Sequence, residues 1–562
     1  MLTRGTATGL TKVQGRTDGR RRREAFAVRL GLIAAMGFGI RLGYALAGDA
    51  KDVSYDGIYY YFVANVLVDG GGYAHPWTGL PTALHPPAWP VLLGLPSAIG
   101  LDTVLTHQVF ACVVGTTTVA LVGIAARVIA GGRVGLVAAA IAAVYPNMWV
   151  RERELAAETL VFPLGAVVLA LAYRYWRTPR IGTLLALGAV CGVLILIHSA
   201  MVSLLLLLIP VLAWRAHPGV SRASRLAHLG AALGVAAVVL LPWVIRNTAQ
   251  FERPVLLTTN LGLTLRAGNC PAAYEGDRLG SFDIDLVRPV APTAPGDCVW
   301  DTGLGDESEQ DAALRDQALT YMREHAERLP TVVAAREGRT WGLFRPFQQA
   351  TLERESGNAP LGVYQLAVFA YWALLPFAVA GAIRLRRSVL PLFPLVSFLV
   401  AVTIVVGITF GSVRYRAPAE VPIIVLAAVG VDALRGRGRS HEIRVSTNAS
   451  APPSASVSVS SAVEEGTQGR ALMGSLTGQQ VMRQQRRSGP GESCSDTTWN
   501  VGRRLQLRQL VQDTGLPGSR VRVRRKGRMC RCGLCMNPSH THSHAESWRV
   551  GIAELVRGAE TA

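Results

Sequence analysis

Long apolar runs between short clusters of arginine constrain this chain more than any other feature of its sequence. Several runs approach twenty residues, the length that an α-helix needs to cross the hydrocarbon core of a bilayer. Only 17% of the 562 residues are charged, against about 25% in a typical soluble protein. The sequence therefore predicts an all-α polytopic membrane protein. Its expected spans, about ten, lie at residues 26–47, 104–126, 134–150, 156–173, 181–197, 199–214, 226–245, 363–383, 388–410 and 417–434.

The arginines predict an orientation, because basic loops stay on the cytoplasmic side of a membrane. Clusters of arginine precede the first span and follow every second span after it. We therefore expect a plasma-membrane protein with both termini in the cytoplasm and two large outer loops, 48–103 and 246–362. Of the net charge of +19, +16 belongs to residues 1–29 and 436–562. This location indicates contact with anionic lipid rather than with nucleic acid.

The same boundaries divide the chain into five parts. They are a basic N-terminus (1–25), an N-terminal membrane domain (26–245), an outer loop domain (246–362), C-terminal membrane helices (363–435) and a tail (436–562). The tail is rich in Ser, Gly, Gln and Arg and has no sustained apolar period, which predicts a disordered cytoplasmic segment. Its CRCGLC sequence has three histidines nearby, but this spacing is not that of a standard zinc finger, so we assign no metal site.

The first outer loop holds an unusual cluster of polar and aromatic residues. Asp56 stands among five tyrosines, and residues 56–68 are expected to form a short amphipathic helix. The proline-broken segment 85–100 is too short to cross a membrane and is expected to lie at its interface. A carboxylate within hydrogen-bond reach of a hydroxyl group can act as a general base. Asp56 is therefore the catalytic candidate, against the alternative that it is merely solvated.

Ionisable residues near the outer ends of the spans supply further candidates. Glu154 and Glu158 form an i, i+4 pair at the start of the fourth span, where a charged group is costly and often functional. Pairing with Arg151 or Arg153 is the alternative. Guanidinium forks bind phosphate oxygens well, although arginines also snorkel to headgroups for purely structural reasons. The candidate arginines at headgroup depth are Arg246, Arg414 and Arg416.

Four stretches of the chain carry a resemblance to known proteins. They are YDGIYYYFVANVLVDGGGY with HPPAWPVLLG, YPNMWVRERELAAETL, PWVIRNTAQFERPVLLTTNLGLTLRAGNC and VRYRAPAEVPIIVLAAVG. Together with the span pattern they cover about residues 25–435. With these four stretches in this order, the chain resembles the GT-C glycosyltransferases of the family 39 type. That family includes protein mannosyltransferases and lipid A aminoarabinose transferases.

The resemblance implies transfer of a sugar from a polyprenyl-phosphate donor to a glycan, lipid or protein acceptor at the outer face. The family's base is an acidic residue of the first outer loop, which here corresponds to Asp56, and we expect Glu154 to work with it. No nucleotide-binding motif is evident, which fits a lipid-linked donor. No cofactor is assigned, and a divalent cation stays open. The residues expected to bind substrate are Tyr55, Tyr60, His85, Glu158, Arg246, Arg414 and Arg416.

A transporter or flippase for a lipid-linked sugar is the alternative function. It would explain the spans and the interfacial arginines, and it predicts internal repeats and broken helices. We see no clear repeat in the sequence.

Two cysteines, Cys270 and Cys298, lie in the long outer loop. An oxidising exterior permits a disulfide between them, and we expect one.

The tail is expected to be dispensable for sugar transfer, because its composition predicts no packed structure. Deleting residues 440–562 should leave transfer of labelled sugar in isolated membranes at the level of the full chain, after correction for the amount of protein. A loss of transfer at equal expression would contradict this expectation.

Overall fold

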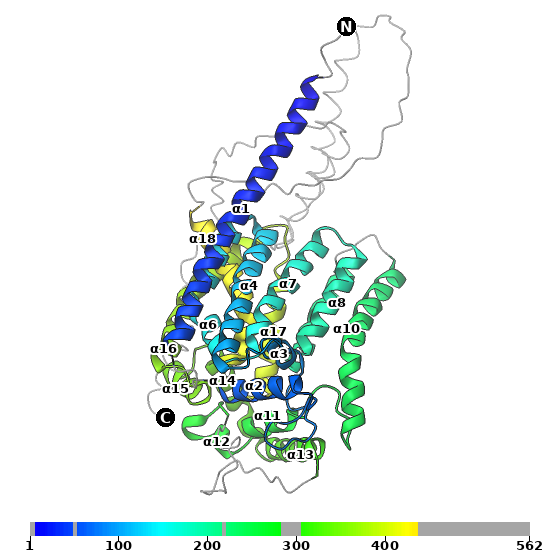
Figure 1. Ribbon diagram of the computed structural model, residues 1–562, viewed down its shortest axis with the longest axis vertical. Coiled ribbons are helices and arrows are strands. Elements are labelled where there is room, and N and C mark those ends of the chain that lie inside the picture. Colours follow the sequence, from blue (N-terminus) through cyan, green and yellow to red (C-terminus); the bar gives the residue numbers. More distant parts are fainter. Residues whose placement is uncertain (1–5, 49–52, 216–220, 283–304, 436–562) are drawn as a thin grey trace, which may run out of the picture. The chain divides into compact units, whose positions relative to one another are not determined.

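The computed structural model describes residues 6–48, 53–215, 221–282 and 305–435, and these residues form a helical bundle without a strand (Figure 1). An isolated bridge joins Ala74 to Pro81 in the first large loop. The helices of the bundle are α1 (Thr6–Ala47), α4 (Val104–Ala130), α5 (Gly132–Val144), α6 (Pro146–Arg153), α7 (Glu158–Arg177), α8 (Ile181–Ile195), α9 (Val202–Arg215), α10 (Arg222–Gln250), α16 (Leu361–Arg386), α17 (Phe393–Ile408) and α18 (Ala417–Arg435).

The predicted all-α membrane class is confirmed, but the count of ten spans is not. Six helices of the described chain are long and apolar enough to cross a membrane: α1, α4, α7, α10, α16 and a helix containing α18. The pair α5 and α6, bent by 48°, would be a seventh span. Each remaining predicted span is a helix of 14 to 16 residues, α8, α9 or α17. At 1.5 Å per residue such a helix is about 21–24 Å long, short of the roughly 30 Å hydrocarbon core.

Helix α18 lies at the centre of the bundle. It packs against α16, α5, α7 and α17, and all residues from Ala417 to Gly430 are buried. Glycines allow α16 and α18 to approach closely, as small residues do at membrane helix interfaces. A Cβ atom on Gly381 would lie 1.9 Å from the carbonyl oxygen of Leu426, and one on Gly430 would lie 2.0 Å from that of Phe377.

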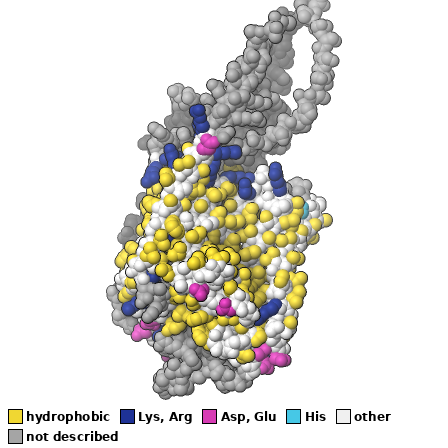
Figure 2. All heavy atoms as spheres, viewed as in Figure 1, with side chains coloured by type: hydrophobic (Ala, Val, Ile, Leu, Met, Phe, Trp, Pro, Cys, Tyr) yellow, Lys and Arg dark blue, Asp and Glu magenta, His cyan; other side chains and the backbone are white. Residues whose placement is uncertain are grey.

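Both large loops fold into short helices at one end of the bundle (Figure 1). On the face seen in Figure 2, most Lys and Arg side chains gather toward the other end, with an apolar belt between. This separation agrees with the predicted topology, although the side of a membrane that each end faces stays a prediction. The loop helices are α2 (Tyr55–Val68), α3 (Ala88–Ala98), α11 (Leu261–Gly268), α12 (Pro271–Tyr274), α13 (Glu307–Glu324), α14 (Leu329–Thr340) and α15 (Pro346–Gly357).

The long loop packs onto the bundle through several of these helices. Helix α14 packs against α17 and α15 against α16, while α13 packs against α11 within the loop. A small apolar core under the loop contains Cys270, Tyr274 and Val332. Cys298, the expected disulfide partner of Cys270, lies outside the described residues, so the disulfide stays a prediction. The tail 436–562, with its weak zinc pattern, also lies outside them.

Because α16 and α18 approach so closely, adding a single methyl group at Gly381 should lower the free energy of unfolding. Gly381→Ala places its Cβ against a backbone oxygen that cannot rotate away, and overpacking of this kind costs about 1–3 kcal/mol. Gly362→Ala, on the same helix but with no atom within 4 Å of its Cβ, should be neutral or slightly stabilising. Thermal unfolding in detergent measures both, and equal midpoints for the two variants would contradict this packing.

Candidate functional site

Helix α2 presents Asp56 in its first turn. Ser54 caps the helix by accepting a hydrogen bond at Oγ from the backbone N–H of Gly57, at 3.0 Å. An acidic side chain is favoured near this end of a helix. The observed helix begins one residue before the predicted range 56–68 and ends at the same residue.

Arg414 joins Asp56 to Glu158. One guanidinium nitrogen, Nη1, lies 2.9 Å from Oδ2 of Asp56, while Nε lies 3.1 Å and Nη2 3.4 Å from the two oxygens of Glu158. The Glu158 contact is therefore a two-pronged fork, a strong and directional form of ion pair. The Asp56 side chain is 32% exposed and that of Glu158 only 4%, so Asp56 is the more open carboxylate of the two.

Two histidines stand near this ion pair. Nε2 of His85 lies 3.9 Å from Oδ1 of Asp56, and Nδ1 of the same ring lies 3.2 Å from the hydroxyl of Tyr60. His198, between α8 and the next helical turn, has its ring 5.9 Å from that of Tyr415. Burial lowers the pKa of both histidines below 6.5, so both are mainly neutral near pH 7.

The pKa of Asp56 reflects two opposing effects. Burial raises it, but the neighbouring Arg414 and the two histidines, His85 and His198, outweigh burial and hold the pKa below the ordinary value of 3.8. Asp56 is therefore a carboxylate at neutral pH and can accept a proton.

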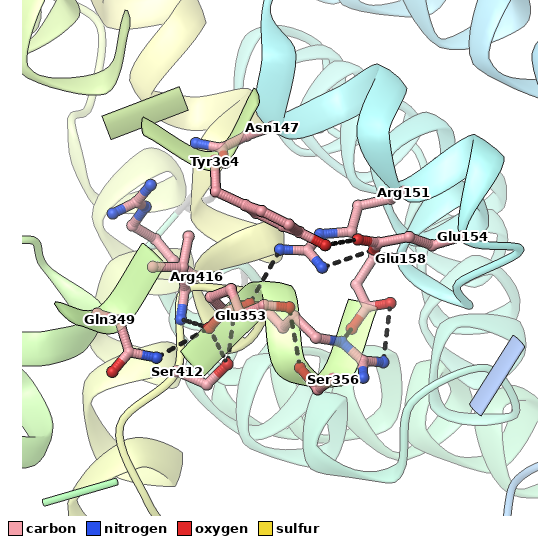
Figure 3. A network of polar contacts seen from close by, with 12 residues as sticks. Asn147, Arg151, Glu154, Glu158, Gln349, Glu353, Ser356, Tyr364, Ser412 and Arg416 are labelled. Atoms are coloured by element: carbon pink, nitrogen blue, oxygen red, sulfur yellow. Dashed lines mark hydrogen bonds and ion pairs between the residues drawn. The ribbon is translucent and has the colours of Figure 1, made fainter. Parts of the chain in front are cut away.

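A second buried network lies beside the first (Figure 3). Nη1 of Arg151 lies 2.7 Å from Glu154, and Nη2 lies 3.2 Å from Glu353. The hydroxyl of Tyr364 donates a hydrogen bond to the other oxygen of Glu154. The other oxygen of Glu353 accepts hydrogen bonds from the residues just before Arg414. The side chain of Glu154 thus bonds to Arg151 and Tyr364, and its predicted partnership with Asp56 stays a prediction without a direct side-chain contact to support it.

The other predicted residues differ in their surroundings. Tyr60 is buried against His85, whereas Tyr55, the first residue of α2, is exposed. Arg246 donates to the carbonyl oxygens of Thr82 and Tyr73, each at 2.7 Å, and so ties α10 to the first large loop.

Arg416 is buried away from Asp56, because it pairs with Glu420 at 2.8 Å and donates to the carbonyl oxygen of Thr340. The structure therefore brings together one group of predicted residues and leaves Glu154, Arg246 and Arg416 in other contacts. That group is Asp56, Tyr60, His85, Glu158 and Arg414.

Three polar groups at this end of the bundle were not predicted from the sequence. Glu353 sits in an ordinary charged helix sequence, LERES, and nothing local to it signals burial. Arg41 forms a buried ion pair with Glu152 at 2.8 Å. An arginine deep within the first apolar run was the unused signal for that pair.

Within the described residues, no group of three or more His, Cys, Asp or Glu side chains is arranged to hold a metal ion. The positive charge between Asp56 and Glu158 comes from Arg414.

Comparison with known proteins supports the predicted resemblance. Residues 84–245 match the family described as dolichyl-phosphate-mannose-protein mannosyltransferase. This match includes HPPAWPVLLG and YPNMWVRERELAAETL, two of the stretches that carry the resemblance. The chain is thus similar to GT-C glycosyltransferases of the family 39 type. No curated protein matches it.

Solved membrane proteins also match. The oligosaccharyltransferase AglB of Archaeoglobus fulgidus, in complex with an inhibitory peptide and a dolichol-phosphate, has 13% identity and a TM-score of 0.44 over 74% of this chain and 50% of its own. ArnT of Cupriavidus metallidurans, bound to undecaprenyl phosphate, has 15% identity and a TM-score of 0.34 over 73% of this chain and 79% of its own. The chain spans about half the length of the archaeal structures that it matches.

The Arg414 ion pairs predict an asymmetry between single and double variants. Arg414→Gln leaves the buried Glu158 without its cation, which should cost about 3 kcal/mol of unfolding free energy. Adding Glu158→Gln removes the uncompensated charge and should restore most of that loss. Arg345→Gln breaks an ion pair with the exposed Asp277 and should cost less than about 1 kcal/mol. Thermal unfolding in detergent at pH 7 compares the variants, and equal losses in the single and double variants would contradict the pairing.

The difference in thermal stability between the native chain and Arg414→Gln should also change with pH in a defined direction. The pKa of Asp56 is depressed in the folded protein, so its stabilising pairing with Arg414 is complete well above pH 3.8. As the pH falls through the folded-state pKa, that contribution is lost. The gap in stability between the native chain and Arg414→Gln should therefore narrow on acidification.

Proposed function

We propose that this protein is a membrane glycosyltransferase. It moves a sugar from a polyprenyl-phosphate donor to an acceptor hydroxyl at the extracytoplasmic face, and Asp56 is the general base. The observation that carries this proposal is a partly open, ionised Asp56 beside Arg414, at the end of the bundle opposite the basic loops. The family match over residues 84–245 supports the reaction class.

The contacts of Asp56 suit a base. Arg414 engages Oδ2 at 2.9 Å, whereas Oδ1 has the His85 ring nitrogen at 3.9 Å, too far for a hydrogen bond. Oδ1 therefore has room to accept a hydrogen bond from an acceptor hydroxyl. A positioned base of this kind typically contributes about 10²–10⁴ in rate.

In the proposed step the acceptor oxygen attacks the anomeric carbon of the donor sugar. The bond between that carbon and the phosphate oxygen breaks, and its electron pair leaves with the polyprenyl phosphate. The hydroxyl proton passes to Asp56. Because a phosphate departs as an anion, one carboxylate suffices for a single inverting displacement.

Arg414 is the best supported ligand of the donor phosphate. Its side chain is 21% exposed and stands beside Asp56, so it can meet a headgroup at the reacting centre. Arg246 binds backbone carbonyls of the first loop, and Arg416 is buried against Glu420. The phosphate would compete with Glu158 for Arg414, and the two neutral histidines could strengthen binding if they became protonated.

A flippase for a lipid-linked sugar remains the second candidate, and one observation favours it. Helices α5 and α6 form a bent pair, and broken helices are frequent at transporter binding sites. The identity of the sugar stays open under both functions, and mannose, arabinose and aminoarabinose are the alternatives that the resemblance suggests.

The proposal predicts a severe and specific effect at position 56. Asp56→Asn and Asp56→Ala should each lower transfer of labelled sugar from polyprenyl-phosphate donors by about 10²–10⁴, because each removes the proton acceptor. Asp69→Asn, at the exposed C-terminal end of the same helix, should leave transfer unchanged.

Each outcome of this assay decides between the alternatives. Transfer at the native rate by both Asp56 variants, at equal expression, would remove Asp56 as the base. Movement of the lipid-linked sugar across the membrane without transfer would favour the flippase.

A further inference from the structure

Arg151 connects the two segments that carry Asp56 and Arg414. We propose that Arg151 is a positioning residue that fixes the guanidinium of Arg414 relative to the carboxylate of Asp56. The catalytic consequence rests on the proposed function, but the geometric claim does not, and it can be tested without an activity assay.

The first line of contacts runs from Arg151 to helix α2. Arg151 binds the carboxylate of Glu154 at 2.7 Å. The backbone carbonyl of Glu154 accepts a hydrogen bond at 3.0 Å from the hydroxyl of Ser54, the residue that caps α2. Gly57 lies directly against that carbonyl, since a Cβ there would be 1.9 Å from the oxygen. The start of α2, which carries Asp56, thus packs directly against the backbone of Glu154.

The second line runs from Arg151 to the turn before Arg414. Arg151 binds Oε2 of Glu353 at 3.2 Å. Oε1 of Glu353 accepts hydrogen bonds from the Ser412 hydroxyl at 2.7 Å and from the Val413 backbone N–H at 2.8 Å. The backbone N–H of Arg414 in turn donates to the Ser412 hydroxyl at 3.2 Å. The backbone at Arg414 is therefore tied to Glu353 through Ser412 and Val413.

The network is buried, and the carboxylates of Glu154 and Glu353 each accept hydrogen bonds from other residues as well as from Arg151. The side chains of Arg151, Glu154 and Glu353 are at most 3% exposed. Tyr364 donates to Glu154, and the Gln349 amide donates to Glu353 at 3.0 Å (Figure 3). Hydrogen bonds in a low-dielectric interior are strong, and a fully satisfied network is rigid. A planar guanidinium can bridge two carboxylates in fixed directions, which the point charge of a lysine does less well.

This position matters because Arg414 is the main cation facing Asp56. The other titratable groups around the carboxylate are His85 before α3, His198 before α9, Glu158 of α7, Tyr60 of α2 and Tyr415 beside Arg414. If Arg151 no longer holds its two partners together, Arg414 can move away from Asp56. An anion at position 56 then loses stabilisation, and its pKa rises.

A thiol at position 56 reports this effect directly. We would introduce Asp56→Cys into the full chain, with the tail cysteines Cys494, Cys530, Cys532 and Cys535 replaced by serine. The rate of alkylation by a small maleimide, measured against pH, gives the pKa of the new thiol, because the thiolate is the nucleophile. Arg151→Lys should raise this midpoint by about 0.5–1 pH unit, and Arg414→Gln, which removes the cation itself, should give the largest rise.

Arg41→Gln is the matched control. Arg41 is also a fully buried arginine, and its partner Glu152 lies on the same helix as Arg151, but none of its contacts leads to Asp56 or Arg414. It should lower thermal stability and leave the alkylation midpoint unchanged. No shift with Arg151→Lys, or an equal shift with Arg41→Gln, would overturn the proposal.

A second variant tests the same proposal if Arg151→Lys does not fold. If Arg151→Lys does not fold, Glu353→Gln replaces it. This change removes the ion pair with Arg151 but keeps a side chain that can bond Ser412. It should also raise the alkylation midpoint. A midpoint equal to that of the parent in folded Glu353→Gln would overturn the proposal.

The activity assay then separates the two claims. With Asp56 intact, Arg151→Lys should move the acid limb of the transfer rate to higher pH by a similar amount. Absence of transfer by the native chain would defeat the proposed function and leave the alkylation result standing. A native acid limb in an active Arg151→Lys variant would defeat the positioning role alone.

Discussion

The pairing of buried carboxylates with arginines is the interaction on which the end of the bundle that carries the loop helices depends. A charge removed from water costs several kcal/mol unless a partner of opposite sign is in contact with it. Two of these pairs join segments far apart in the chain: Arg41 meets Glu152, and Arg414 meets Glu158 across 256 residues. The first loop, the long loop and the final helix can therefore pack together only in an arrangement that satisfies these charges.

Asp56 differs from the other members of these pairs in its exposure. The carboxylates that pair with Arg41, Arg151 and Arg416 are almost fully buried, as structural ion pairs are expected to be. About a third of the Asp56 side chain remains accessible, although it shares the same kind of partner. A carboxylate that is both held ionised and open to an approaching molecule is suited to chemistry, which is why the proposed reaction centres on it.

The sequence predicted the membrane class and the positions of the helices well, because both follow from apolar periodicity and from helix-breaking residues. The break at His198 and the short helix around Asp56 were expected and are observed. The count of ten full spans stays a prediction, because three of the expected spans are helices of only 14 to 16 residues and an apolar run does not reveal how short its helix becomes. The sequence predicted Asp56, Glu158 and Arg414 as site residues, with Glu154 as the partner of Asp56. It did not predict that Arg414 joins Asp56 to Glu158, because these are tertiary contacts between segments far apart in the chain. Glu353 shows the limit most clearly, as its burial depends on three segments that meet only in the folded chain.

In the proposed reaction the donor phosphate binds Arg414, beside the 2.9 Å ion pair of that arginine with Asp56. A cryo-electron microscopy structure of the full chain with a bound polyprenyl phosphate would test it most directly, by the position of the phosphate. The account predicts phosphate oxygens within hydrogen-bond distance of the Arg414 guanidinium, with Oδ1 of Asp56 facing the space beside them. A phosphate bound at Arg246 without contact to Arg414, or at the opposite end of the bundle, would contradict it.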